Sequence, residues 1–185
     1  MNKKGIDRFF DAAPLEVQEL FARDCANRAI QEYAPLALRR AGIEDVATTL
    51  EKLSVPTHDW RKAERYQALD ELYGVLNKAL ARAKASFGGR GESKSLRSSS
   101  HAEHTVREVF RIMEKFPKED FWGVSVSAVA CAGEAHFSKP SAVGREVALQ
   151  EEWIRLNFSE GMRAYNSRIS ESLDAYIAEG VILED

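Results

Sequence analysis

The chain has 185 residues, of which 44% are hydrophobic and 30% are charged, and its formal net charge is −3. This length and hydrophobic content suffice for one globular domain with a buried core, and the mixture of both charge signs argues against global disorder. The slight acidic balance argues against a general nucleic-acid-binding domain, because such domains usually have a clear basic excess.

The N-terminus and the two cysteines indicate the cellular compartment. The first residues are charged and lack the apolar stretch of a secretory signal, and no window reaches the roughly 18 apolar residues of a membrane span. Cys25 and Cys131 lie far apart, without a CxxC motif or a disulfide-rich spacing. We interpret them as buried, reduced thiols, and we expect a soluble cytoplasmic protein that binds no membrane.

Helical patterns dominate the chain, and strand patterns are nearly absent. We expect the first helix to begin at Pro14 and to end near Tyr33, with apolar residues on two of its sides. A short leucine-containing helix should follow and end at Gly42, because glycine is a favoured C-cap. Another helix, over residues 46–53, should end before Pro56.

Residues 58–87 have the clearest helical pattern, with apolar residues at three- and four-residue steps along one face. The next segment, 88–100, contains three glycines and five serines, and we expect it to be a flexible loop. This segment lacks the glycine-lysine spacing of a phosphate-binding loop and does not follow a strand.

Three further helices are expected in the second half, over residues 100–116 and 119–137 and from Pro140 to near Ala178. The last one is either a single helix or two helices broken near Gly161, and both alternatives remain open. The sequence therefore predicts a single all-α domain over residues 1–185, an irregular bundle of about six to eight helices.

Two histidines near the start of the 100–116 helix raise the question of a metal site. His101, His104 and Glu108 share one face of that helix, opposite its apolar residues, so we expect them to face water. Ser100 and Glu103 fit the pattern of a capping box at a helix start. Two histidines and one carboxylate fall short of a firm zinc site, and we predict neither a metal nor a cofactor.

The 119–137 helix should be the most buried one, because residues 121–137 are apolar on almost every side. Glu134 lies on a thin polar strip, whereas His136 should be covered, which would lower its pKa unless a carboxylate such as Asp24 lies against it. Asp24 itself precedes Arg28 by four residues, the spacing of a helical ion pair. Whether Asp24, Glu134 and His136 have structural or functional roles stays open.

Two segments are similar to a known family. Glu-Leu-Phe-Ala-Arg-Asp-Cys-Ala-Asn-Arg-Ala-Ile (19–30) resembles the opening helix of helical immunity proteins from bacterial polymorphic toxin systems. Ala-Val-Ala-Cys-Ala-Gly-Glu-Ala-His (128–136), followed by the Trp-containing segment 144–158, resembles the later part of that family. The resemblance implies a helical protein that binds and neutralises a cognate toxin and catalyses no reaction.

The second half of the chain is the more acidic one, which favours a basic protein partner. We therefore predict a non-enzymatic, protein-binding module in which Glu146, Glu151, Glu152 and Trp153 contact the partner. No catalytic residues are predicted, because the sequence has no nucleophile elbow and no cysteine in a basic environment. Two alternatives remain: a small helical enzyme or metal-binding protein that uses His104 and Glu108 or Glu134 and His136, and a helical adaptor or assembly subunit.

Overall fold

The computed structural model describes residues 3–56, 63–86 and 93–158. These ranges are mostly helical and contain no strand, which confirms the predicted all-α class. In chain order the elements are α1 (Lys3–Ala12), α2 (Leu15–Arg28), the π-helix η1 (Ala29–Tyr33), α3 (Ala34–Arg40), α4 (Glu44–Leu50), α5 (Ala63–Ala85), α6 (Ser93–Lys115), the 3₁₀-helix η2 (Phe116–Lys118), α7 (Phe121–Ala135), α8 (Pro140–Trp153) and the π-helix η3 (Ile154–Phe158).

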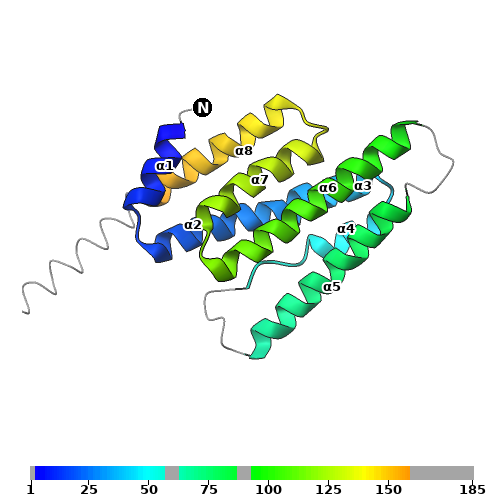
Figure 1. Ribbon diagram of the computed structural model, residues 1–185, viewed down its shortest axis with the longest axis horizontal. Helices are drawn as coiled ribbons and strands as arrows, with labels where there is room; N and C mark the ends of the chain where they lie inside the picture. Colours follow the sequence, from blue (N-terminus) through cyan, green and yellow to red (C-terminus); the bar gives the residue numbers. More distant parts are fainter. Residues whose placement is uncertain (1–2, 57–62, 87–92, 159–185) are drawn as a thin grey trace, which may run out of the picture.

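Helix α7 occupies the centre of the bundle, as the sequence predicted. It packs against α2, α3, α6 and α8, and Figure 1 shows it between α6 and α8. Alanine and serine line its inner side, including the buried Ala128, Ala132 and Ser125. Such small side chains let neighbouring helices approach closely. Helix α5 packs on α6 and α4, at the other side of the bundle.

Helices α2 and α3 belong to one continuous helical segment that is interrupted by η1. The backbone at Arg28 and Ala34, on either side of η1, keeps right-handed helical angles. The N–H of Ala34 bonds to the carbonyl of Ala29, five residues back. Pro35 accounts for this widened turn, because a proline ring has no N–H and collides with the carbonyl four residues before it. The sequence predicted a break after Tyr33, where the chain instead continues as a π-turn.

Glycine and aspartate define two of the helix boundaries. Gly42 ends α3 with a φ of 76°, and the N–H of Ile43 bonds to the carbonyl of Leu38 at 2.9 Å. This closure confirms the predicted glycine C-cap. Helix α7 begins after Asp120, whose Oδ1 accepts the N–H of Gly123 at 2.9 Å. A Cβ at Gly123 would collide with the Asp120 carboxylate, so any other residue there would require the capping side chain to shift.

The prediction of a flexible loop over residues 88–100 is wrong for residues 93–100. Helix α6 begins at Ser93, so residues 93–100 form its first turns, whereas residues 87–92 lie outside the described ranges. Ser99 is buried at 1% exposure, in step with the buried Ala102 and Val106. The buried stripe of the helix thus extends back into the serine-rich run. Because these residues are serines and not apolar residues, their helical spacing was not recognised from the sequence. Consequently Ser100 is no N-cap, and Glu103 accepts hydrogen bonds from Arg107 instead.

Other boundaries also differ from those the sequence suggested. Helix α1 was missed, although Ile6 and Phe9 are both buried and repeat at a helical spacing. Helix α4 ends at Leu50 and leaves Leu53 in the following loop. The predicted start of a helix at 58 and the possible break near Gly161 lie outside the described ranges, as does the predicted helix after Phe158.

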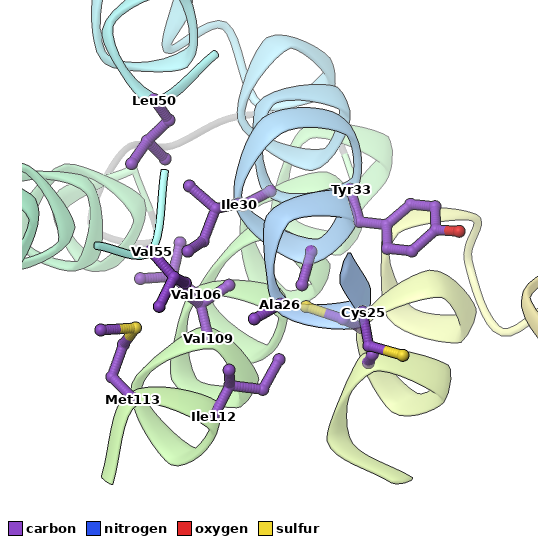
Figure 2. Close-up of a cluster of buried hydrophobic side chains, with 14 of the residues drawn as sticks. Cys25, Ala26, Ile30, Tyr33, Leu50, Val55, Val106, Val109, Ile112 and Met113 are labelled. Atoms are coloured by element: carbon purple, nitrogen blue, oxygen red, sulfur yellow. The ribbon is translucent and has the colours of Figure 1, made fainter. Parts of the chain in front are cut away.

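Buried apolar residues from all the elements between α1 and α7 form the core. Figure 2 shows Ile30 near Val106 and Val109 of α6. Leu50 and Val55 belong to the same cluster of buried side chains. Cys25 and Cys131 are both buried free thiols, as predicted. The buried stripe of α6 includes Val106, Val109, Ile112 and Met113 and continues to Phe116 of η2, and all five residues are at most 2% exposed.

Replacing Ala128 by leucine tests the close packing on the inner face of α7. Ala128 is fully buried, so the added atoms must displace neighbouring side chains, and we expect the free energy of unfolding to fall by about 1–3 kcal/mol. Urea denaturation would measure the change. Ala130→Leu, on the outer, half-buried side of the same helix, should cost less than about 0.5 kcal/mol. Equal losses at both positions would contradict this orientation of α7.

Candidate functional site

A buried ion pair connects two helices that are far apart in sequence. Arg28 of α2 donates from Nη2 to Glu146 Oε1 at 2.8 Å and from Nε to Glu146 Oε2 at 3.0 Å. Glu146 belongs to α8, and its side chain is fully buried. The predicted helical pair between Asp24 and Arg28 also forms. Glu146 is therefore not on the surface, where the sequence analysis placed it as a partner contact.

Two further donors complete the hydrogen bonding of the Glu146 carboxylate. Tyr33 Oη donates to Oε2 at 2.5 Å, and Gln150 Nε2 donates to Oε1 at 2.9 Å. Gln150 also donates to the carbonyl of Ser125 on α7, at 3.1 Å. Each carboxylate oxygen thus accepts two hydrogen bonds, which offsets the cost of burying the charge. This set of side chains joins α2, η1, α7 and α8.

The cluster changes the protonation of the groups around it. Burial raises the pKa of Tyr33, and the hydrogen bond to Glu146 and its negative charge raise it further. Burial alone would lower the pKa of Arg28, but the hydrogen bonds and charge of Glu146 outweigh it, so that pKa is raised. Burial also raises the pKa of Cys25 and of Cys131. Both thiols are therefore neutral at physiological pH, which makes them poor nucleophiles.

The other residues predicted to contact a partner lie at the end of α8. Glu151 and Glu152 are exposed. Trp153 is half-buried, and its ring lies 5.2 Å from that of Phe21 and 6.3 Å from that of Phe9. Trp153 thus anchors α8 against α1 and α2, with its ring packed on the aromatic residues of the core.

Large exposed apolar side chains gather at the same end of the bundle. The contacts of Phe21 with Trp153 and of Gln150 with Ser125 place the start of α2, the start of α7 and the end of α8 together, and Figure 1 shows these three ends side by side. In the described ranges, the exposed large hydrophobic residues come from these segments and from η3, which follows α8: Leu15, Leu20, Trp122, Val126 and Leu156. We call this end, with Glu151 and Glu152, the acidic-apolar end. Sequence periodicity could not identify it, because it depends on how the helices are packed.

The two histidines lie in the middle of α6, and only His104 faces water as predicted. His101 is half-buried; its Nδ1 lies 2.8 Å from Glu134 Oε2, and its ring packs on that of Phe137. His104 is exposed, with its Nδ1 3.9 Å from the same Glu134 oxygen. Glu108 pairs with Arg111 instead. Among the described residues, no group of three or more such side chains is placed to hold a metal ion.

His136 is half-buried at the C-cap of α7. Burial lowers its pKa, and the charges of Arg40, Arg145 and Lys139 lower it further. The predicted direction of this shift is therefore confirmed, although the positive neighbours were not foreseen. Glu134, which the sequence places on a thin polar strip, is half-buried and contacts His101.

Comparison with known proteins found no matching family model, no similar curated protein and no similar solved structure. Within the described ranges, no helix combines the length and the apolar character that crossing a membrane requires.

Tyr33→Phe tests whether the buried carboxylate depends on all its donors. The substitution removes one hydrogen bond from a fully buried oxygen, so the free energy of unfolding should fall by about 1–3 kcal/mol. Tyr73→Phe is the matched control, because no hydrogen bond joins the Tyr73 hydroxyl to the part of the chain that the structure describes. Thermal or urea denaturation gives both values, and an unaffected Tyr33→Phe variant would argue against a fully hydrogen-bonded carboxylate.

The raised pKa values of Cys25, Cys131 and Tyr33 predict that the protein loses stability in alkali. In the unfolded chain, thiols ionise near pH 8.5 and phenols near pH 10, whereas the folded chain keeps these protons. Above about pH 8.5 the unfolded state therefore binds fewer protons, and the free energy of unfolding should fall as the pH rises. Urea denaturation at several alkaline pH values measures this slope, which should be shallower in Cys131→Ala. A flat or rising profile would contradict the burial of these groups.

Proposed function

We propose that this chain is a non-enzymatic, protein-binding helical domain that acts in the bacterial cytoplasm as an immunity protein. Its partner is a basic toxin domain, which it neutralises by binding. The observation that favours this function most is the acidic-apolar end of the bundle. Its exposed apolar side chains lie on helix ends that also present exposed carboxylates.

The apolar part of this end has the features of a protein-binding surface. Trp122 and Val126 are one turn apart on α7, and they are 46% and 45% exposed. Leu20 and Leu156, on the neighbouring helix ends, are more than half exposed. Scattered exposed leucines are normal on protein surfaces, but several large apolar residues at one end favour a partner. An exposed tryptophan is the residue type that most often anchors an interface.

The charged part of this end fits a basic partner. Glu151 and Glu152 are exposed on α8, and Glu16 is exposed on the first turn of α2. Exposed carboxylates steer a positively charged partner toward the surface and accelerate association, an effect that weakens with added salt. Glu146 has no part in this surface because it is buried. Trp153 contributes indirectly, by fixing the end of α8 against Phe9 and Phe21.

The chemistry of the interior is compatible with a protein that catalyses no reaction. The buried thiols are neutral. The buried carboxylate of Glu146 is fully engaged by four hydrogen bonds from the protein. Because the thiols and this carboxylate are all buried, they are not exposed to a substrate, which is compatible with a binding function.

Coexpression with the product of the adjacent reading frame, which the proposal expects to be a toxin, tests the proposal. The wild-type chain should bind that product and protect the cells, and the affinity should decrease with salt. Glu151→Lys/Glu152→Lys should weaken binding at least about tenfold, and Trp122→Ala should do so by a similar factor. The free energy of unfolding should stay nearly unchanged, because all three side chains are exposed.

A charge reversal on another part of the surface distinguishes the effect of these carboxylates from the effect of the protein's net charge. Asp70→Lys/Glu71→Lys makes the same change of charge on exposed residues of α5, at the other side of the bundle. This control should bind like the wild type. Three results would contradict the proposed function: an equal loss of affinity in both double variants, association that is independent of salt, or an adjacent metabolic gene whose product does not bind.

A further inference from the structure

A second charged surface, of opposite sign, lies around the turn between α7 and α8. The ring of Phe137 lies beneath two guanidinium groups, with its centroid 4.9 Å from Arg40 Cζ and 5.8 Å from Arg97 Cζ. Arg40 comes from the end of α3 and Arg97 from the first turns of α6. The turn itself is held by the N–H of Ser138, which bonds to the carbonyl of Gly133 at 2.7 Å.

Two more cations extend this surface on the α8 side. Lys139 is the N-cap residue of α8, and Arg145 follows on the same helix, and both side chains are exposed. Together with Arg40 they surround His136 closely enough to lower its pKa. The first turn of α8 contains no acidic residue that would offset the positive end of the helix dipole. We call Arg40, Arg97, Lys139 and Arg145 the basic turn cluster.

The arginines of this cluster differ from the other exposed arginines of the described surface because they have no carboxylate partner. The other exposed arginines whose side chains the structure describes each pair with a carboxylate: Arg39, Arg82, Arg107, Arg111 and Arg155. In contrast, Arg40, Arg97 and Arg145 have no carboxylate within ion-pair distance in the described ranges. The neighbouring carboxylate, Glu134, is occupied by His101. The chain has more acidic than basic residues, so unpaired cations grouped at one place are unexpected.

Helix capping explains only one of these cations. Arg40 donates to the carbonyl of Ala135, at the C-terminal end of α7, where a positive charge is stabilising. Lys139 lies at a helix N-terminus, where a positive charge is unfavourable, and Arg145 makes no described hydrogen bond. Arg97 contacts only the face of Phe137 among the interactions that the structure describes. The stability of the fold therefore does not account for Lys139 or Arg145, and it accounts for Arg97 only through the cation–π contact with Phe137.

We propose that the basic turn cluster binds an acidic protein segment, a run of aspartate or glutamate side chains on a partner. The cations are exposed and come from four segments, so they suit an extended, multiply charged chain better than a single small anion. A nucleic acid fits less well, because the chain has a sequence pI near 5.9, and nucleic-acid-binding domains are usually strongly basic. This surface lies away from the acidic-apolar end and does not depend on the proposed function.

A short poly-glutamate peptide, labelled with a fluorophore, is the probe that tests this inference. At low ionic strength it should bind the full chain and shift the NMR signals of the His136 ring and of the turn amides. Lys139→Glu/Arg145→Glu should weaken binding at least about tenfold, because attraction becomes repulsion at two positions. Arg97→Gln, which removes one charge without reversing it, should weaken binding by a smaller factor.

Lys52→Glu/Lys84→Glu is the matched control, since both lysines are exposed and the net charge changes by the same amount. It should bind the peptide like the wild type. The inference is overturned if the peptide does not bind, if both double variants lose affinity equally, or if a single-stranded oligonucleotide binds more tightly than the peptide. Circular dichroism of each variant shows that it is folded, and if Lys139→Glu/Arg145→Glu is not, the Arg97→Gln result decides.

Discussion

The rest of the bundle depends on the buried carboxylate of Glu146. A charge in a protein interior costs several kcal/mol unless it is paired and hydrogen-bonded, and here one arginine, one tyrosine and one glutamine provide four hydrogen bonds. Because these donors come from α2, η1 and α8 itself, they are satisfied only when α8 lies in one register along α2. The ion pair thus specifies the position of α8 along α2. Apolar packing alone would define this position less well.

This register also determines the surface. When Glu146 pairs with Arg28, the end of α8 lies beside the start of α2, and Trp153 reaches the ring of Phe21. The exposed acids after Glu146 then lie at the same end as the exposed Trp122 of α7. At the opposite end of α8, the turn after α7 collects cations from α3 and α6. One buried contact therefore positions two surfaces of opposite charge.

Much of the fold follows from local sequence patterns, and the site follows from long-range packing. Apolar spacing was enough to find α5, α7 and the buried stripe of α6, and Gly42 marked the end of α3. Composition was misleading at residues 93–100, where serines occupy buried helical positions, and Pro35 widened a turn where we expected a break. The pairing of Arg28 with Glu146 spans 118 residues and leaves no local signal, so Glu146 looked like a surface acid.

A double-mutant cycle on Arg28 and Glu146 tests the central claim most directly. Arg28→Met and Glu146→Met each leave one partner without its main counter-charge, and each should lower the free energy of unfolding by about 3–5 kcal/mol. The double variant should cost far less than the sum of the two, because it strands neither charge, and the coupling should exceed about 1 kcal/mol. Additive losses, or single variants as stable as the wild type, would contradict the account.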